Sequence, residues 1–343
     1  MTPLVRHRLF WPAVVLVLLL VSNVFFAPRF FTITLQDGHL YGSLIDVLRS
    51  ATPLALVALG MTMVIATGGI DLSVGSVMAI SGAVACLFIG DLSDPGSVGG
   101  VLLAVGLALG LSAVAGIWNG VLVSVIGIQP IIATLILMVA GRGIAQLLTG
   151  GQIINVSSPP FRVIGAGYLL GVPVSVIIVA VVVAAAVLLI RRSALGVLVE
   201  AVGASPTASR LAGIRARGLT IMAYVFAAVC AGIAGLIFSS NVASADSNAA
   251  GNLIELDAIL AVVIGGTALT GGRFSIAGSV LGAVLISALD ITTYTIGVPA
   301  ETTLLFKAVV VVILCLSQSA AFRAAVFRRR RTPAATPAAE VPA

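Results

Sequence analysis

Apolar residues fall along this chain in runs that are separated by short polar segments, from near the N-terminus to residue 316. An α-helix needs about 20 predominantly apolar residues to cross the hydrocarbon core of a bilayer. Because most of the runs approach that length, the pattern predicts an all-α, polytopic membrane protein with about ten transmembrane helices. The predicted spans cover residues 9–26, 52–66, 74–90, 101–125, 131–149, 172–190, 219–240, 254–269, 276–291 and 304–316.

The composition agrees with a chain that lies in a membrane. Of the 343 residues, 60% are hydrophobic and 9% are charged, and the mean hydropathy is +1.22. A soluble domain carries about 25% charged residues. One membrane domain uses nearly the whole length, which leaves no room for a soluble catalytic domain.

The formal net charge of +6 is distributed in a way that indicates topology rather than nucleic-acid binding. Most of the 18 basic residues lie at Arg6 and Arg8, in residues 191–217, and in residues 323–331. Cytoplasmic loops carry an excess of Lys and Arg. We therefore expect a cell-membrane protein with both termini in the cytoplasm and no nucleic-acid partner. The predicted parts are a cytoplasmic N-terminus at 1–8, a transmembrane domain at 9–322 with a cytoplasmic loop at 191–218, and a disordered Arg-, Pro- and Ala-rich tail at 323–343.

One glycine-rich segment occurs twice. Residues 67–77 read TGGIDLSVGSV and residues 270–280 read TGGRFSIAGSV, with six of the eleven positions identical. Corresponding glycine-interrupted apolar segments in two halves of a transporter point to its substrate path. The alternative is two ordinary glycine-rich helix contacts. An even number of predicted spans separates the copies, which predicts parallel repeats, although many importers use inverted ones.

Several polar residues interrupt the apolar runs. Asp71, at the break in the first copy, would line a path or gate, or would cap the next helix through backbone N–H groups near Ser73. Neutral amides such as Asn119 could bind sugar hydroxyls, but the same residues could equally join helices by hydrogen bonds. Arg142 could also reach toward an interface. The residues predicted for the path are Gly68, Gly69, Asp71, Ser73, Asn119, Gln129, Arg142, Gln146, Gly271 and Gly272.

Motifs for catalysis, ATP binding and metal binding are absent from the sequence. The single lysine, Lys307, lies in the context FKA, whereas a Walker A loop needs Gly-Lys-Ser/Thr to hold phosphates. There is no GxSxG, HExxH or CxxC, and the three cysteines each lie in an apolar run. We expect no enzyme activity, no metal and no cofactor in this chain.

The internal polar loop has a helical pattern of its own. A short amphipathic helix is predicted at residues 195–202, followed by a turn at 203–206 and a second short helix from Thr207. A compact helical element on the cytoplasmic face is what a membrane subunit needs to dock a motor domain. The alternative is an ordinary positively charged loop.

These segments resemble a known family. GGIDLSVGSVMAISGA at residues 68–83 resembles a motif of ribose-type ABC sugar importer permeases, and LGVLVEAVGASPTASRLAGI at 195–214 is similar to that family's ATPase-coupling loop. The likeness extends from about residue 36 to residue 321. The family often has Asn where Ser205 stands and Ala where Ser209 stands, so this copy departs from the pattern there.

The resemblance implies a function and a set of partners. The chain would be the permease subunit that moves a monosaccharide, a hexose or a pentose, while a separate ATPase subunit, expected to have two fused cassettes, hydrolyses ATP. An extracytoplasmic sugar-binding protein and a second permease, identical or paralogous, would complete the complex. The resemblance places the ATPase contact at Glu200, Ala201, Gly203, Ser205, Ala208, Arg210 and Gly213.

Two other classes of transporter remain as alternatives. An ion-coupled secondary transporter would need an intramembrane charged site, for which Asp71 is the main candidate. An ABC permease for branched-chain amino acids would share the general design, although the segment GGIDLS favours sugar.

Overall fold

The computed structural model describes residues 10–26, 30–36, 38–297 and 299–318. The cytoplasmic N-terminus predicted at 1–8 and the tail predicted at 323–343 lie outside the described residues. Within them, each predicted apolar run coincides with a helix. The helices are α1 (Phe10–Phe26), α2 (Ser43–Ala66), α3 (Val74–Gly90), α4 (Val98–Val121), η2 (Leu122–Ile126), α5 (Pro130–Thr149), α6 (Pro159–Ala166), α7 (Val174–Arg192), α8 (Leu195–Ala204), α9 (Pro206–Leu211), α10 (Ala216–Val242), α11 (Ile254–Ile264), α12 (Ile276–Ile296) and α13 (Ala300–Gln318).

Six helical segments of the described chain are long and apolar enough to cross a membrane. They are Ser43–Ala66, Val98–Ile126, Pro130–Thr149, Val174–Arg192, Ala216–Val242 and Ile276–Ile296. The protein is therefore an all-α, multi-pass membrane protein, and the count of ten transmembrane helices stays a prediction. The run at 254–269 shows why the two numbers differ. Its helix, α11, has 11 residues and is about 16 Å long, roughly half the thickness of the hydrocarbon core.

Helix α2 begins earlier than the sequence predicted. The polar residues of segment 27–50, Pro28, Arg29, Asp37, Gly38 and Asp46, predict an external loop or a surface helix, but α2 starts at Ser43 and runs for 24 residues. Its first turns carry Asp46 and Arg49, and the same helix continues past Pro53 into the core. Asp46, one of the polar residues that argued against a span, therefore lies in the first turns of one.

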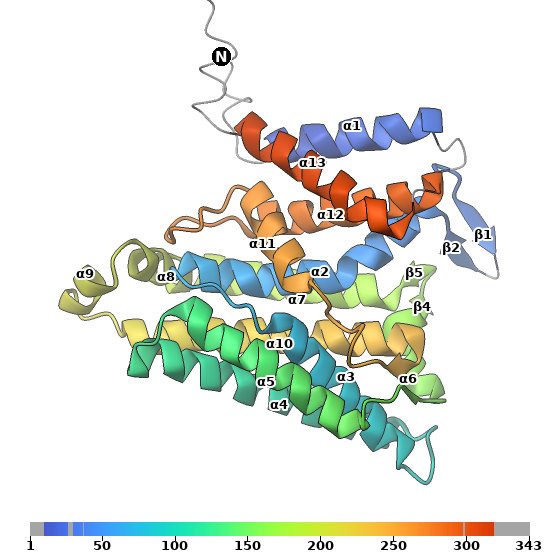
Figure 1. Ribbon diagram of the computed structural model, residues 1–343, viewed down its shortest axis with the longest axis horizontal. Coiled ribbons are helices and arrows are strands. Elements are labelled where there is room, and N and C mark those ends of the chain that lie inside the picture. Colours follow the sequence, from blue (N-terminus) through green and yellow to red (C-terminus); the bar gives the residue numbers. More distant parts are fainter. Residues whose placement is uncertain (1–9, 27–29, 37, 298, 319–343) are drawn as a thin grey trace, which may run out of the picture.

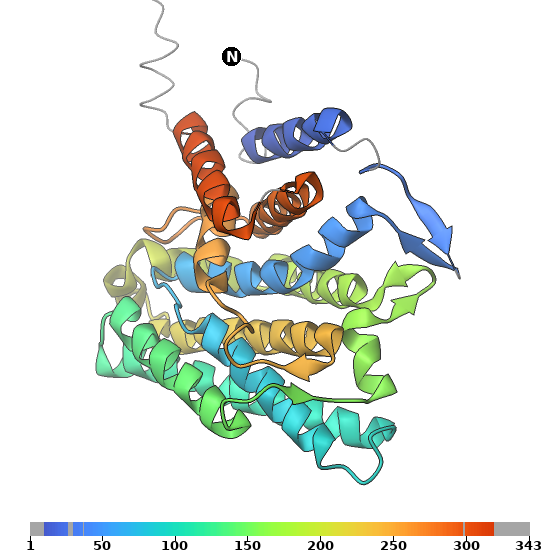
Figure 2. The same ribbon diagram turned by 45° about the vertical axis from the view of Figure 1, so that its right-hand side comes forward.

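The helices lie roughly along one direction, with α8 and α9 at one end of the bundle and the short strands at the other (Figure 1). Helices α2, α10 and α12 are mostly buried, whereas α4, α5 and α7 expose most of their surface. Small residues allow the close packing at the centre, since a Cβ on Gly60 of α2 would lie 2.6 Å from the Cα of Ala227 of α10. Figure 2 shows α1 and α13 on one side of this centre and α3, α4 and α5 on the other.

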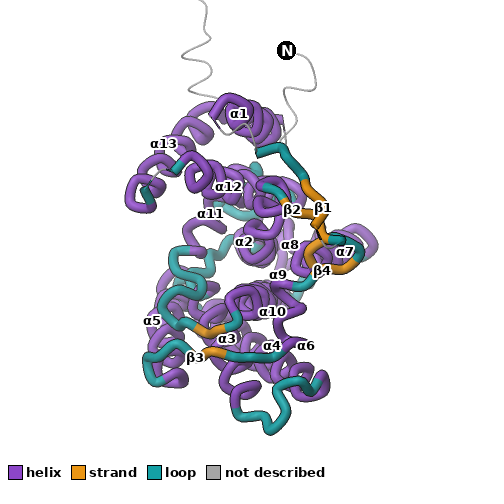
Figure 3. Tube along the Cα trace, turned by 90° about the vertical axis from the view of Figure 1, so that its right-hand side faces the viewer, coloured by secondary structure: helices purple, strands orange, loops and turns teal. Residues whose placement is uncertain are grey.

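Three pairs of short strands order the loops. Strand β1 (Thr34–Gln36) pairs with β2 (His39–Tyr41), and β4 (Tyr168–Leu169) pairs with β5 (Val172–Pro173). Figure 3 views the bundle from the end that carries these strands, where the His39 ring stacks on Tyr168 at 4.5 Å. Strand β3 (Ile154–Asn155) pairs with β6 (Ser244–Ala245) and joins the loops after α5 and α10.

Candidate functional site

The two glycine motifs meet in space. Gly68 and Gly271 both have φ of +86°, a backbone conformation that side chains disfavour. A Cβ on Gly271 would lie 3.0 Å from the Cα of Gly68, and the N–H of Gly272 donates a hydrogen bond of 3.0 Å to the carbonyl of Ala66. We call this contact, formed by residues 66–69 and 271–272, the glycine junction.

Helix α8 ends against the glycine junction. A Cβ on Gly203 would overlap the carbonyl oxygen of Ala66 and lie 2.5 Å from the nitrogen of Gly272. The break predicted within residues 203–206 does not fall at Gly203. This glycine lies inside α8, and it is needed there because another backbone comes so close. The break in the chain falls at Ser205, whose hydroxyl accepts a 3.2 Å hydrogen bond from the N–H of Ala208 and caps α9.

The loop from α8 to α9 has one buried side and one exposed side. Val199 and Val202 are fully buried against the bundle, whereas Ala208, Arg210 and Leu211 are exposed. Gly213 follows α9 with φ of +81°, so it is the glycine of this loop with a left-handed backbone. Glu200 and Ala201 are half-buried. The arrangement fixes the loop to the bundle and leaves one side of α9 exposed.

Three of the residues predicted for the path form a buried polar cluster. The Oδ1 atom of Asp71 accepts hydrogen bonds from the backbone N–H and the hydroxyl of Ser73, at 2.9 and 2.6 Å. The Nδ2 atom of Asn119 donates to the Ser73 hydroxyl at 2.8 Å. All three side chains are fully buried. Asp71 thus binds a backbone N–H just before α3 begins, and the cluster ties the first glycine motif to α4.

Arg142 and Gln146 lie elsewhere, on α5, where they hold the loop between α10 and α11. The guanidinium of Arg142 donates to the carbonyls of Ser247 at 2.7 Å, Ala250 at 2.6 Å and Gly251 at 3.3 Å. The amide of Gln146 donates to the side chain of Asn248 at 2.7 Å. Both residues therefore join segments by hydrogen bonds, which was the alternative to a place on the path. Gln129 is exposed at the start of α5.

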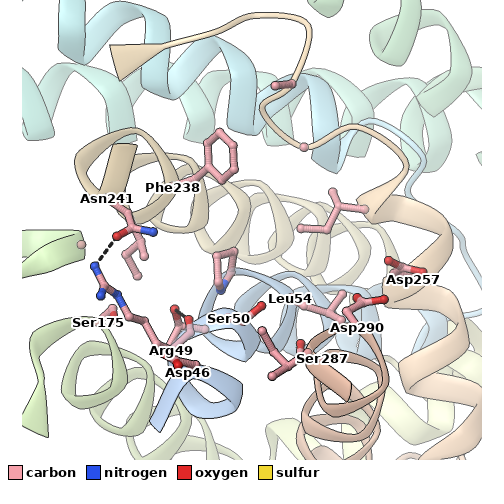
Figure 4. A pocket seen from close by; sticks show the side chains of 18 of the residues that line it. Asp46, Arg49, Ser50, Leu54, Ser175, Phe238, Asn241, Asp257, Ser287 and Asp290 are labelled. Atoms are coloured by element: carbon pink, nitrogen blue, oxygen red, sulfur yellow. Dashed lines mark hydrogen bonds between the residues drawn. The ribbon is translucent and has the colours of Figure 1, made fainter. Parts of the chain in front are cut away.

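A cavity of about 930 Å³ is lined by residues near the end of the bundle opposite α8 and α9. It lies among the first turns of α2 and α7, the last turns of α10 and α12, and the start of α11. Apolar side chains, among them Leu54 and Phe238, line the cavity together with polar ones (Figure 4). The polar residues are Ser43, Asp46, Arg49, Ser50, Thr52, Ser175, Asn241, Asn252, Asp257, Ser287, Asp290, Tyr294 and Thr295.

None of the ten residues predicted for the path lines this cavity. The sequence did carry a signal for it, because Asp46, Arg49, Asp257 and Asp290 are charged residues within or next to apolar runs. In the sequence, each of these residues lies in a predicted loop or at the edge of a predicted span. Only the packing of α2, α11 and α12 shows that they face one space.

The charged residues of the cavity are joined across helices. The guanidinium of Arg49 donates to the side-chain oxygen of Asn241, which links α2 to α10. At the other side, the ammonium of Lys307 on α13 lies 2.9 Å from Asp257 of α11 and 3.1 Å from Asp290 of α12. By sequence, Asp290, Glu301 and Lys307 could form a rim pair, although their spacing is not diagnostic. Lys307 pairs with Asp290 and also with Asp257, and the side chain of Glu301 is outside the described part.

Comparison with known proteins places the chain in a family. The model of the branched-chain amino acid transport system / permease component family matches residues 43–315. The chain belongs to this permease family. It is 47% identical to the galactofuranose transporter permease protein YtfT of Escherichia coli K12 over 92% of this chain and 93% of that one. It is 40% identical to the fructose import permease protein FruF of Bifidobacterium longum, over 92% and 89%, and 36% identical to the ribose import permease protein RbsC of E. coli K12, over 89% and 91%.

The match to this permease family agrees with the multi-pass membrane architecture and covers the glycine junction, the α8–α9 loop and the cavity together. No solved structure matches the chain.

Proposed function

We propose that this chain is the membrane-spanning permease subunit of an ATP-binding-cassette importer for a monosaccharide. The observation that carries the proposal is the similarity, at 36–47% identity over about nine tenths of each chain, to permeases named for galactofuranose, fructose and ribose. The description of the family model refers to branched-chain amino acids, but these three relatives are named for sugars. Galactofuranose is the first candidate substrate, because the relative named for it has the highest identity of these three.

The chemistry of the cavity supports a sugar. Small-molecule sites usually enclose about 300–1,000 Å³, and this cavity, at about 930 Å³, lies at the upper end of that range. A sugar has a hydroxylated edge and apolar C–H faces. The carboxylates, amides and hydroxyls of the cavity could bind the hydroxyls, while Leu54 and Phe238 could contact the apolar faces.

The distribution of basic residues supports one orientation in the membrane. Arg191, Arg192, Arg210, Arg215 and Arg217 flank or occupy the α8–α9 loop, and such an excess is typical of the cytoplasmic side. With α8 and α9 in the cytoplasm, the cavity opens to the outside. The same rule, applied to Arg6, Arg8 and residues 323–331 of the sequence, supports cytoplasmic termini. The glycine junction then closes the inner end of the path.

The predicted path can now be given a direction. We infer that sugar enters the cavity from outside and leaves past the glycine junction and the neighbouring Asp71–Ser73–Asn119 cluster. Gln129, Arg142 and Gln146 were also predicted for the path, but the hydrogen bonds of Arg142 and Gln146 favour a role in holding the loop at residues 247–251. We keep Gly68, Gly69, Asp71, Ser73, Asn119, Gly271 and Gly272 as the proposed inner path.

We also propose that the membrane domain, residues 9–322, arose by duplication and crosses the bilayer about ten times. Each glycine motif lies between two helices, α2 and α3 for the first copy and α11 and α12 for the second, and Gly68 and Gly271 share the same φ. This agreement supports parallel rather than inverted copies.

The proposed partners follow from the same reading. A separate ATPase subunit with two cassettes would dock on α8 and α9, so ATP hydrolysis would belong to that partner and not to this chain. A binding protein would deliver sugar to the outer end, and a second permease, identical or paralogous, would complete the path. The exposed apolar side chains of α4 and α5 leave surface for lipid and for that second permease.

Transport by the reconstituted complex tests the proposal. The chain would be incorporated in proteoliposomes with its ATPase and binding protein, and uptake of radiolabelled galactofuranose, fructose, ribose and leucine would be measured with and without ATP. We expect ATP-dependent uptake of one of the sugars and none of leucine. Leucine uptake would favour the amino-acid alternative, and uptake driven by an ion gradient without ATP would favour a secondary transporter.

A further inference from the structure

The large cavity has a charged group on each of two sides. Figure 4 shows Asp46, Arg49 and Asn241 on one side and Asp257 and Asp290 on the other, with Leu54 and Phe238 between them. The first group is already engaged, because Arg49 donates to Asn241 and so crosslinks α2 and α10. The second group consists of two carboxylates that share a single lysine.

Lys307 contacts these carboxylates from outside the cavity. Its side chain is 12% exposed, against 26% for Asp257 and 39% for Asp290, and it does not line the cavity whereas both aspartates do. The ammonium contacts only the Oδ2 atom of Asp257 and both oxygens of Asp290, at 2.9 to 3.2 Å. The group of three carries one net negative charge and presents carboxylate oxygens to the cavity.

We propose that Asp257 and Asp290 form the sugar-binding wall of this cavity, with Lys307 as the residue that positions them. The proposal rests on the proposed function, since it names the residues that would recognise the monosaccharide. A carboxylate accepts about four hydrogen bonds, and Lys307 uses only part of that capacity. The remaining lone pairs accept from sugar hydroxyls in charge-assisted hydrogen bonds, which are about twice as strong as neutral ones.

The lysine has a physical reason to be there. Two carboxylates close together in a membrane protein repel each other and are costly to bury, so a cation between them stabilises both in the charged state. Lys307 also fixes α13 to α11 and α12 through its two partners. Its role is therefore positional, and it makes no contact with the sugar.

A chemical protection experiment on the complete importer tests the proposal. Ser50 is exposed and lines the cavity, so Ser50→Cys places a thiol beside the site. Cys86 and Cys230 are buried, and Cys315→Ser removes the remaining thiol. The complex in proteoliposomes is treated with a charged, membrane-impermeant methanethiosulfonate, and the rate of modification is measured against increasing galactofuranose, fructose or ribose.

We expect the transported sugar to slow the modification. Asp257→Asn and Asp290→Asn keep the shape of the side chain but remove its charge, and each should raise the half-protecting sugar concentration about tenfold, equal to about 1.4 kcal/mol. Lys307→Arg should leave that concentration within about twofold, and Lys307→Gln should raise it. Asp91→Asn, which removes an exposed carboxylate outside the cavity, is the matched control and should change nothing.

Other outcomes overturn the proposal in distinguishable ways. If Asp257→Asn and Asp290→Asn are protected at the same sugar concentration as the complex with both aspartates, the three residues only connect the helices and do not bind sugar. Sugar uptake by the unmodified importer without any protection of Ser50→Cys would move the binding site out of this cavity while the proposed function stood. Absence of both uptake and protection would overturn the proposed function as well.

Discussion

Gly203 of α8 lies directly against the backbone of Gly272 in the second glycine motif. A Cβ on Gly203 would come within 2.5 Å of the Gly272 nitrogen and would overlap the Ala66 carbonyl that this nitrogen binds. The end of α8 therefore packs directly against the hydrogen bond from the N–H of Gly272 to the carbonyl of Ala66. Because the two backbones are in direct contact, a movement of α8 would displace the glycine junction.

The first prediction concerns the contact between the two motifs. Gly271→Ala should destabilise the protein and abolish most sugar uptake, because its Cβ would lie 2.9 Å from the Gly203 carbonyl and 3.0 Å from the Cα of Gly68. Gly127→Ala is the control, since Gly127 has a similar φ of +85° but open space around it. Both variants carry a left-handed strain of about 1–2 kcal/mol. The unfolding temperature and the uptake should therefore fall further in Gly271→Ala than in the control. Equal losses in the two variants would show that the contact between the glycine motifs is not important for transport.

The second prediction concerns Asp71. Asp71→Asn keeps an oxygen that can accept from the N–H and hydroxyl of Ser73, so it should retain stability and much of the uptake. Asp71→Leu leaves those buried donors unpaired, at about 1–3 kcal/mol each, and should lower the unfolding temperature and the uptake. The comparison is made at equal protein in the membrane. A complete loss of uptake in both variants would show that the charge itself is required.

The third prediction concerns Arg142. Arg142→Met removes the hydrogen bonds to the carbonyls of Ser247, Ala250 and Gly251, and the loop that they hold should open more often. Hydrogen exchange of residues 244–253 reports this directly and should become faster. Arg162→Met, at an exposed residue of α6, should leave the exchange of that loop unchanged. Unchanged exchange in Arg142→Met would return Arg142 to the list of path residues.

Much of the helix pattern could be predicted from apolar runs alone. α3 matches the predicted span at 74–90 at both ends, and α1 and α5 each match to within one residue. The duplicated glycine segment also predicted two chain breaks with a similar backbone, and Gly68 and Gly271 do share a φ of +86°. The positions of apolar helices depend on the local sequence, and a hydropathy profile therefore predicts them well.

The cavity and the reason for Gly203 could not be predicted in the same way. Asp46, Arg49, Asp257 and Asp290 are far apart in sequence, and only the packing of α2, α11 and α12 brings them to one space. The polar start of α2 hid its first turns, since a charged helix end resembles a loop in a hydropathy profile. Gly203 looked like a turn residue, and the backbone that approaches it comes from residues 66 and 272.

The central claim is that a partner ATPase drives sugar movement through α8 and the glycine junction. Its most direct test is sugar-stimulated ATP hydrolysis by the reconstituted complex that carries Gly203→Ala, compared with Gly218→Ala. Gly218 lies near the start of α10 with open space around it, whereas a Cβ at Gly203 costs about 1–3 kcal/mol of overlap at the junction. We predict that Gly203→Ala still binds the ATPase in a pull-down but loses most of the stimulation by sugar, while Gly218→Ala keeps it. Full stimulation in Gly203→Ala with intact ATPase binding would contradict the account.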